Sequence, residues 1–319
     1  MTSGRNVVDV DHLTKRFGDR VALDDVSLAV RAGELFGVIG PDGAGKTTLF
    51  RILATLLVPE AGSATVLDLD VVRGLWELRL RIGYMPGRFS LYPDLSVAEN
   101  LDFFASVFGT SVEREYEQIA PIYSQLEPFR DRRAGALSGG MKQKLALCCA
   151  LVHRRELLLL DEPTTGVDAV SRREFWDLLS RIQGERLTIV VSTPYMDEAN
   201  RCDRVALVQH GRILGVDTPD AIRRSFDRPL ISIRAADRYR LIEALHAYPQ
   251  TRSVFPFGDV LHFTDRRADH ASDAVVADVD AFLRGHGVGG VIAVATEPTI
   301  EDVFIARMGA PEAVGAAAP

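Results

Sequence analysis

The chain has 319 residues, of which 47% are hydrophobic, and a formal net charge of −7 at pH 7. This length allows a full core and two domains, whereas the acidic balance argues against binding of nucleic acid, which usually requires a basic face. No apolar run approaches the roughly 18–20 residues of a membrane helix, and the N-terminus lacks a signal-peptide core. Three cysteines without metal-binding spacing (Cys148, Cys149, Cys202) are expected to be buried and reduced. The sequence thus predicts a soluble cytoplasmic protein.

The first two-thirds of the chain alternates strand and helix patterns. Strands are expected at residues 7–13, 21–30, 34–39, 157–160, 188–192 and 204–208. Helices are expected at residues 46–57, 141–152, 170–182 and 195–201, with a mostly helical stretch over 96–126 that is interrupted near Gly109 and Pro121. This alternation predicts an α/β fold with a mostly parallel sheet, preceded by antiparallel strands.

The composition changes after about Arg228. Strands are expected at residues 229–235, 252–255, 260–263 and 291–295, with helices at 239–247 and 271–283. The order βαββαβ suits a small ferredoxin-like α+β module over residues 228–308 that ends with a helix at 300–308. Residues 309–319 are rich in Ala, Gly and Pro and are expected to form a flexible tail.

Residues 40–47 read GPDGAGKT and match the phosphate-binding pattern G-x-x-x-x-G-K-[ST] between an apolar strand and a helix. The small residues let backbone N–H groups point at a β-phosphate, and the helix adds its positive N-terminal end. Lys46 is predicted to bridge the β- and γ-phosphates and the Thr47 hydroxyl to bind Mg²⁺. The expected ATP-binding residues here are Gly40, Pro41, Asp42, Gly43, Ala44, Gly45, Lys46, Thr47 and Thr48.

Asp161 and Glu162 follow the apolar strand at residues 157–160. A carboxylate at the C-terminal end of a parallel strand faces the ligand crevice of an open α/β sheet. On its own, Asp-Glu-Pro could equally be a solvated strand end, but after a phosphate-binding loop it favours a nucleotide site.

Residues 137–141 read LSGGM, between the phosphate-binding loop and Asp161-Glu162-Pro163. In this order the three motifs resemble the ATPase subunits of ABC transporters, from the start of the chain to about residue 220. The resemblance implies an ABC-type P-loop NTPase domain over residues 1–227 with a helical subdomain at about 90–152. It also implies that Asp161 holds Mg²⁺ through water and that Glu162 is the catalytic general base of ATP hydrolysis.

The resemblance further implies that the signature residues contact ATP held on an opposite subunit, so a homodimer or a heterodimer with a second ABC ATPase is expected. These residues are Leu137, Ser138, Gly139, Gly140 and Met141. Asp168 matches a loop that crosses the dimer interface, although it could equally cap the following helix. Phe17 stands where the family stacks an aromatic ring on adenine, although a lone Phe is more often part of a core.

Two positions depart from the family pattern. Gly87 stands where the family has a Gln, and Pro194 stands where it has a His that contacts the γ-phosphate. Proline has no side-chain donor or acceptor, so ATP hydrolysis at this site is expected to be slow. Two hypotheses follow: an asymmetric pair with a faster site on another subunit, or a homodimer that relies on Glu162. A regulatory ATP-binding subunit without useful turnover is a further alternative.

Residues 297–304 (EPTIEDVF) resemble the end of ATPases that drive multidrug, antibiotic or polysaccharide exporters. We therefore expect the ATPase subunit of an ABC export system, at the inner face of the cell membrane with membrane-spanning permease subunits as partners. Residues 88–100 lie where the family docks the membrane subunit, and Phe89 and Tyr92 are either anchors for it or cover their own core. A non-transport ABC protein is the remaining alternative.

Overall fold

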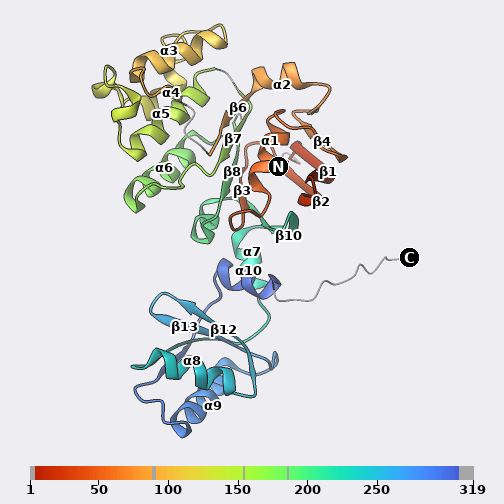
Figure 1. Cartoon of the computed structure of the whole chain (residues 1–319), viewed down its shortest axis with the longest axis vertical. Helices are drawn as coiled ribbons and strands as arrows, with labels where there is room; N and C mark the ends of the chain where they lie inside the picture. The colour runs from red at the N-terminus through yellow and green to blue at the C-terminus, as the bar shows by residue number, and fades with distance from the viewer. Residues whose placement is uncertain (1–3, 88–90, 154, 185–186, 309–319) are drawn as a thin grey trace. The chain divides into compact units, whose positions relative to one another are not determined.

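The computed structural model describes residues 4–87, 91–153, 155–184 and 187–308 (Figure 1). They form two compact units that divide after Pro219, whereas the sequence places the domain boundary at 227. Within the described residues, no helix is both long enough and apolar enough to cross a bilayer. Cys148, Cys149 and Cys202 are free and buried, as expected, and burial raises the pKa of each thiol. The expected tail at 309–319 lies outside the described residues.

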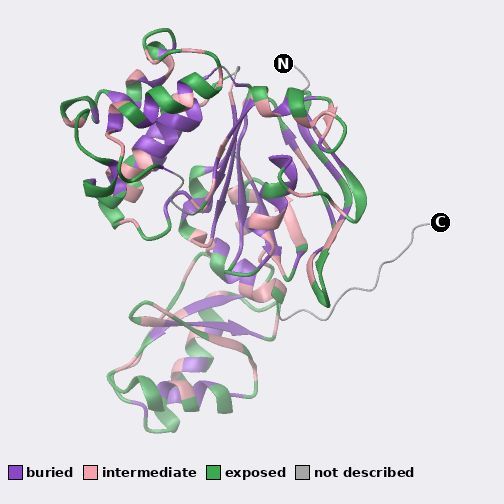
Figure 2. Ribbon diagram, turned by 45° about the horizontal axis from the view of Figure 1, so that its top comes forward, coloured by how far each residue is buried: buried purple, intermediate pink, exposed green. Residues whose placement is uncertain are grey.

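A six-stranded sheet forms the centre of the first unit. Its order is β10 (Arg212–Asp217), β9 (Arg204–Gln209), β3 (Leu35–Ile39), β8 (Thr188–Thr193), β7 (Leu157–Asp161) and β6 (Ile82–Met85). All neighbouring pairs are parallel except β10 with β9, so the prediction of a mostly parallel sheet is confirmed. Strand β7 is buried along its whole length (Figure 2), which explains its continuous leucines.

An antiparallel sheet precedes and packs beside this centre. It has the order β2 (Arg20–Arg31), β1 (Asn6–Phe17), β4 (Ala61–Val66) and β5 (Leu69–Asp70). Helix α1 (Lys46–Leu53) contributes Leu49 and Phe50 to the core that both sheets share. The helix ends earlier than the predicted residue 57, and Thr55 adopts a left-handed φ of 61° that helices do not continue through.

The remaining helices of the first unit are α2 (Leu75–Arg81), α3 (Val97–Val107), α4 (Tyr116–Tyr123), α5 (Gly139–Leu151) and α6 (Ala169–Ile182). Helix α3 begins at a capping box made by Ser96 and Glu99. Gly109 lies past its end as predicted, but Pro121 lies inside α4 and does not interrupt it. Proline has no backbone N–H, so Pro121 removes one backbone hydrogen bond near the end of α4 and leaves the first turn of the helix intact.

The predicted helix at 195–201 is the 3₁₀ helix η3 (Met196–Arg201). Strands β4, β5 and β10, helix α2 and the short helix at Pro219–Arg224 were not predicted. Short 3₁₀ turns η1 (Glu127–Phe129) and η2 (Ala134–Ala136) connect α4 to α5.

The second unit begins at Asp220, within α7 (Pro219–Arg224), and contains a four-stranded antiparallel sheet. Its elements in chain order are β11 (Leu230–Arg234), α8 (Arg238–Ala247), β12 (Thr251–Phe257), β13 (Val260–Asp265), α9 (Ser272–Gly285), β14 (Ile292–Ala295) and α10 (Ile300–Met308). The sheet order is β12-β13-β11-β14. The predicted βαββαβ order is therefore confirmed, and Pro256 lies on the edge strand β12, where a missing N–H is tolerated.

Candidate functional site

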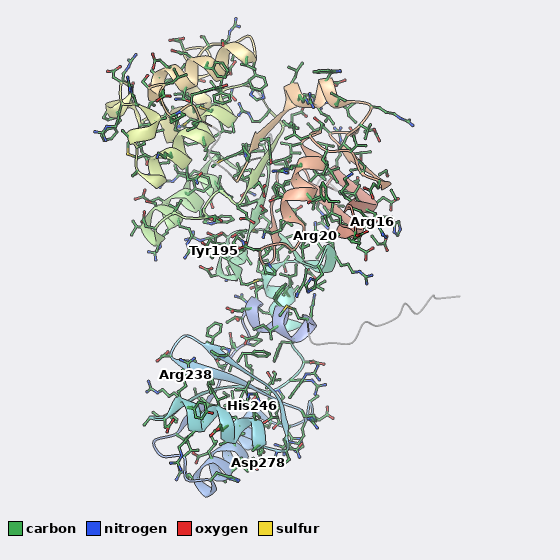
Figure 3. All side chains as sticks on the ribbon, in the orientation of Figure 1. Arg16, Arg20, Tyr195, Arg238, His246 and Asp278 are labelled. Atoms are coloured by element: carbon green, nitrogen blue, oxygen red, sulfur yellow. The ribbon has the colours of Figure 1, made fainter. Side chains whose placement is uncertain are left out.

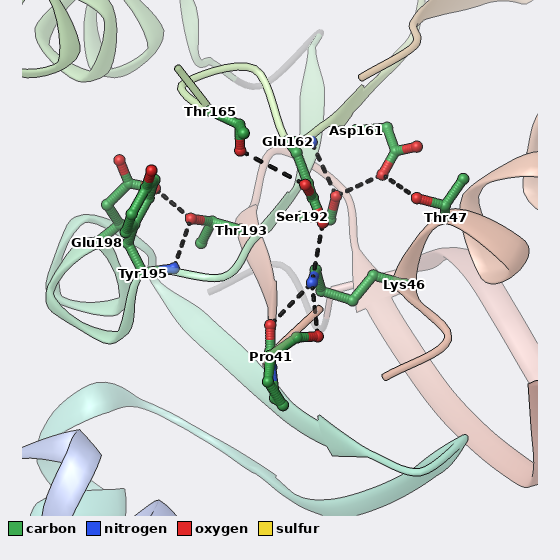
Figure 4. Close-up of polar contacts among 11 residues, drawn as sticks. Pro41, Lys46, Thr47, Asp161, Glu162, Thr165, Ser192, Thr193, Tyr195 and Glu198 are labelled. Atoms are coloured by element: carbon green, nitrogen blue, oxygen red, sulfur yellow. Dashed lines mark hydrogen bonds and ion pairs between the residues drawn. The ribbon is translucent and has the colours of Figure 1, made fainter. Parts of the chain in front are cut away.

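The loop between β3 and α1 wraps around the side chain of Lys46. Gly45 precedes the helix with φ of 103°, and a β-carbon there would come 2.4 Å from the carbonyl oxygen of Ala22, so only glycine fits. Lys46 is 3% exposed, and its Nζ donates to the carbonyl oxygens of Gly40 at 2.8 Å and Pro41 at 3.0 Å (Figure 4). The ammonium is thus held at the start of the helix, where anions bind.

Lys46 also forms an ion pair with Glu162. Its Nζ lies 2.9 Å from Glu162 Oε1, and the Glu162 side chain is 21% exposed. Glu162 adopts a left-handed φ of 52°, and its backbone N–H donates to Ser192 Oγ at 2.9 Å. The loop that follows β7 therefore turns Glu162 back toward the phosphate-binding loop.

Asp161 is buried at the end of β7, 2% exposed, and accepts two hydroxyl hydrogen bonds at Oδ1. Ser192 Oγ donates at 2.7 Å and Thr47 Oγ1 at 3.2 Å (Figure 4). Burial raises the pKa of Asp161, and the hydrogen bonds from Ser192 and Thr47 oppose this rise.

The oxygens of Thr47 and Asp161 fit a Mg²⁺ ion that arrives with a nucleotide. Mg²⁺ in such sites is held by one or two carboxylates together with substrate phosphates. One hydroxyl and one carboxylate oxygen together suit a metal that also binds the phosphates of a ligand. In the described part of the chain, no group of three or more His, Cys, Asp or Glu side chains is placed to hold a metal.

A pocket of about 280 Å³ opens over the loop. It is lined by Phe17, Arg20, Ala22, Gly43, Gly45, Lys46, Thr47, Thr48 and Glu162. Phe17 lies at the rim and is 50% exposed, and Arg20 (labelled in Figure 3) was not predicted from the sequence. Asp42 is exposed at the loop tip and is not among the lining residues. The pocket is smaller than the roughly 300–1,000 Å³ of typical ligand sites, so a nucleotide would protrude from it.

The structure does not bring the signature residues Leu137–Met141 or Asp168 to this pocket. Ser138 caps α5, since its Oγ accepts from Met141 N at 3.3 Å. Asp168 caps α6 by accepting from Val170 N at 3.1 Å and Ser171 N at 3.0 Å. Asp168 has the capping geometry that the sequence left open, and Ser138 and Asp168 each mark a helix N-terminus.

Gly87 and Pro194 lie just past the ends of β6 and β8, and Gly87 lies against Asp161 and Glu162. A β-carbon at Gly87 would come 2.9 Å from the carbonyl oxygen of Asp161, so a glutamine here would require the backbone to shift. Pro194 directly follows β8, and Tyr195 N donates across it to Thr193 Oγ1 at 3.1 Å. Gly87 is thus closely packed against the backbone of Asp161, and Pro194 lies in a turn that the Thr193 hydroxyl holds.

Sequence reasoning missed Ser192, which donates to the Asp161 carboxylate and accepts from the Glu162 backbone N–H. The sequence does place a hydroxyl residue near the end of the strand at 188–192. Its contact with Asp161 could be predicted only with the knowledge that β8 pairs with β7. Of the two expected docking aromatics, Phe89 lies outside the described residues. Tyr92 is 47% exposed, and its ring centroid lies 4.8 Å from that of Phe103.

Residues 23–165 match the family described as ABC transporter. The chain is 42% identical over 224 residues to the "Probable multidrug ABC transporter ATP-binding protein YbhF" of Escherichia coli K12, which covers 70% of this chain but only 39% of that protein. It is 35% identical over 314 residues to the "Nod factor export ATP-binding protein I" of Bradyrhizobium diazoefficiens, which covers 97% of this chain and 98% of that protein.

Solved structures show the same cassette fold. The structure of an ATP-binding subunit of an ABC transporter superposes with a TM-score of 0.62 at 27% identity over 69% of this chain and 93% of that one. A dimeric post-hydrolysis state of the ATP-binding cassette MJ0796 with ADP and Pi gives 0.59 at 25% identity over 66% of this chain and 98% of that one. The cassette fold, the motif order and the near full-length relative together show that this chain belongs to the family of ABC transporter ATP-binding proteins.

Proposed function

We propose that this chain binds and hydrolyses ATP to drive an export system. The observation that carries the proposal is the placement of Lys46. A buried ammonium lies 2.9 Å from Glu162 Oε1 and is held by two loop carbonyls, beside the Thr47–Asp161 pair. Groups suited to phosphoryl transfer thus converge from the phosphate-binding loop and the end of β7, as this chemistry requires.

We assign each residue of the site a role from its position. Lys46 and the N–H groups of its loop hold the phosphates, while Phe17 offers a ring for the base. Thr47 and Asp161 would hold Mg²⁺, which would neutralise phosphate charge. Glu162 exchanges its contact with Lys46 for the attacking water, which it orients and from which it accepts a proton.

A second subunit completes the site. The pocket is small, and Ser138 and Asp168 lie outside its lining at helix N-termini, which attract anions. We infer that these residues serve the nucleotide of an opposite subunit in a homodimer or heterodimer. The MJ0796 cassette, a dimer in its post-hydrolysis state, supports this inference.

The proposal that the system is an exporter rests on the names of two relatives. One is named a multidrug ABC transporter protein and another a Nod factor export protein. We infer membrane-spanning permease subunits as partners, a position at the inner face of the membrane, and docking near Tyr92. The domains are proposed to be the ATPase at 1–227, with a helical subdomain at about 90–152, and an accessory module at 228–308.

Gly87 and Pro194 favour a second candidate, a slow or regulatory ATP-binding subunit within a heterodimer. Glycine and proline at these two turns lack the polar side chains that the family pattern implies. The two candidates differ in one measurable quantity, the ATP turnover of this chain alone.

Steady-state ATP turnover of the purified chain, compared with its Glu162→Gln variant, tests the proposal. We expect measurable turnover that falls roughly 100-fold or more in the variant, the usual cost of losing one catalytic group. ATP binding should persist in both proteins. The matched control is Glu60→Gln, because this glutamate pairs with Lys15 at 3.3 Å outside the pocket lining.

Absence of ATP binding would overturn the proposal altogether. Binding without turnover in both proteins would support the regulatory candidate, and a second ABC ATPase subunit should then be added. Turnover that Glu162→Gln leaves unchanged would remove Glu162 from its proposed role.

A further inference from the structure

A second buried carboxylate, Glu198, lies on η3 just past Pro194. Glu198 is 3% exposed. Its Oε2 accepts a hydrogen bond from Thr193 Oγ1 (Figure 4) and another from Thr164 Oγ1 at 3.1 Å. We call these three residues the Glu198 clasp.

The clasp joins the two chain segments that hold the proposed catalytic residues. Thr164 lies two residues after Glu162 in the loop that leads to Asp168 at the start of α6. Thr193 ends β8 and directly follows Ser192, which contacts both Asp161 and Glu162. Through one carboxylate oxygen, the turn after β8 is fixed to the loop after β7.

The hydroxyl of Thr193 also secures the turn that contains Pro194. It accepts from Tyr195 N at 3.1 Å while it donates to Glu198. Arg172 of α6 approaches from the other side, with its Nε 3.8 Å from Glu198 Oε1 and its guanidinium 4.6 Å from the centre of the Tyr195 ring. Helix α6 and η3 are therefore tied together at the same point.

This arrangement is costly for a residue with a structural role alone. Burial raises the pKa of Glu198, opposed by the neighbouring Thr193, Trp176 and Thr164 side chains, and Oε1 has no partner at hydrogen-bond distance in the part of the chain that the structure describes. A buried carboxylate that is incompletely paired destabilises a fold relative to an apolar residue of similar size. Its geometry, by contrast, suits one task, which is to accept two hydroxyl hydrogen bonds from two loops.

We propose that Glu198 is a positioning residue for ATP hydrolysis, which fixes the loop from Glu162 to Asp168 against the turn after β8. This inference rests on the proposed ATPase function. Glu198 itself does not line the nucleotide pocket, so its effect should fall on turnover rather than on ATP binding.

Three variants separate this role from simple stability. Glu198→Ala removes the acceptor, and we expect kcat to fall roughly 10- to 100-fold, as small misplacements of catalytic groups do, with KM for ATP within about twofold. Glu198→Gln keeps an oxygen that can accept from both hydroxyls and should stay within about threefold of the wild type. Asp197→Asn is the matched control, since this exposed neighbour also lies 3.8 Å from Arg172 and should leave kcat unchanged.

A double-mutant cycle in kcat then identifies the partner. Thr164→Val should reduce kcat in the wild type but add little to Glu198→Ala, because both changes break the same hydrogen bond. Additive effects, an unchanged kcat in Glu198→Ala, or failure of Glu198→Gln to rescue would each overturn the proposal.

Hydrogen exchange provides a readout that does not depend on turnover. In Glu198→Ala the amides of residues 165–168 should exchange at least about tenfold faster, while those of α5 keep their wild-type rates. If the wild type proves inactive, the ATPase proposal fails, but the exchange rates still decide whether the clasp fixes the loop. Unchanged exchange at 165–168 would refute the clasp, and faster exchange throughout the first unit would reassign Glu198 to general stability.

Discussion

The two ends of strand β7 bury polar groups in opposite ways. At its C-terminal end, Asp161 and Lys46 are buried and are paired with hydroxyl, carbonyl and carboxylate groups. Before its N-terminal end, Arg155 and His153 are 8% and 6% exposed. All three guanidinium nitrogens of Arg155 and Nδ1 of His153 lack hydrogen-bond partners among the described residues.

This difference distinguishes two kinds of buried polar group. Those at the C-terminal end of β7 are arranged for a ligand, whereas those before its N-terminal end only lower the stability of the fold. Polar groups at the first end satisfy one another and can exchange those contacts for phosphate and metal. Burial lowers the pKa of Arg155 to about 9, opposed by the charge of Glu115. The guanidinium nevertheless remains charged near neutral pH, and desolvation of a charge without hydrogen bonds is unfavourable.

The largest effect is expected from Lys46→Met, which breaks the paired end. Loss of the ammonium removes the cation that the loop holds for phosphates, and ATP affinity should fall roughly 100-fold or more. Titration with a fluorescent ATP analogue measures it. Lys15→Met is the control, because Lys15 lies 5.6 Å from the Phe17 ring but outside the pocket lining. Equal losses in the two variants would contradict a specific role for Lys46.

A smaller effect of opposite sign is expected from Glu162→Gln. This change releases Lys46 from a charge-assisted hydrogen bond worth about 1.5–3 kcal/mol, so ATP should bind roughly tenfold more tightly. Competition of ATP against the same analogue, with Mg²⁺, measures the change. Asp42→Asn removes a carboxylate from the exposed loop tip and should change affinity less than about threefold. Equal tightening by Asp42→Asn would mean that general charge, not release of Lys46, is the cause.

The sequence predicted the paired end far better than the unpaired one. The phosphate-binding loop and Asp161-Glu162 are contiguous motifs whose strand and helix context is local, so their convergence could be expected from alternation and strand polarity. The α/β fold with a mostly parallel sheet and the βαββαβ module followed from the same periodicities, whereas the cassette was implied by the resemblance of the motifs to ABC transporter ATPases. The roles of the individual site residues stay predictions.

The contacts that sequence reasoning missed are all long-range. Ser192 meets Asp161 only because β8 pairs with β7 in one register, and Glu198 meets Thr164 across 34 residues of chain. Arg155 is buried because its side chain packs at Gly83 of β6, where a β-carbon would come 3.0 Å from Arg155 Cδ. Periodicity indicates which residues are buried but not which buried groups find partners.

Replacement of Arg155 by an apolar residue should raise the stability of the folded protein, because it removes one of the unpaired polar groups before β7. Arg155→Met keeps an unbranched apolar stem and removes the buried charge, and the free energy of unfolding should rise by on the order of 1–4 kcal/mol, as for other buried ions replaced by apolar residues. Urea unfolding at pH 7 measures it. Arg181→Met, at an exposed arginine that lines the same groove of about 900 Å³, should change stability by less than about 0.5 kcal/mol. A destabilised Arg155→Met protein would show that the guanidinium is stabilised in solution.

The smallest expected effect is the pH dependence of stability that His153 causes. Burial, helped by the charge of Arg155 and opposed by the Ile82 carbonyl, lowers the pKa of His153 to about 4 from 6.5. Between these values the unfolded chain binds a proton that the folded chain does not, so stability falls as the pH drops through 6.5 toward 4. Between pH 7 and pH 5 the loss from this group should be about 1–2 kcal/mol.

Urea unfolding at both pH values, compared with His153→Gln, isolates the contribution of His153. The variant should lose less stability than the wild type by that amount, whereas His210→Gln, at an exposed histidine of the same unit, should keep the full wild-type loss. Because the charge of Arg155 also lowers the pKa of His153, the wild-type loss should shrink in Arg155→Met. An undiminished loss in that variant would mean that the charge of Arg155 does not act on His153, and that burial and the Ile82 carbonyl set the pKa of His153.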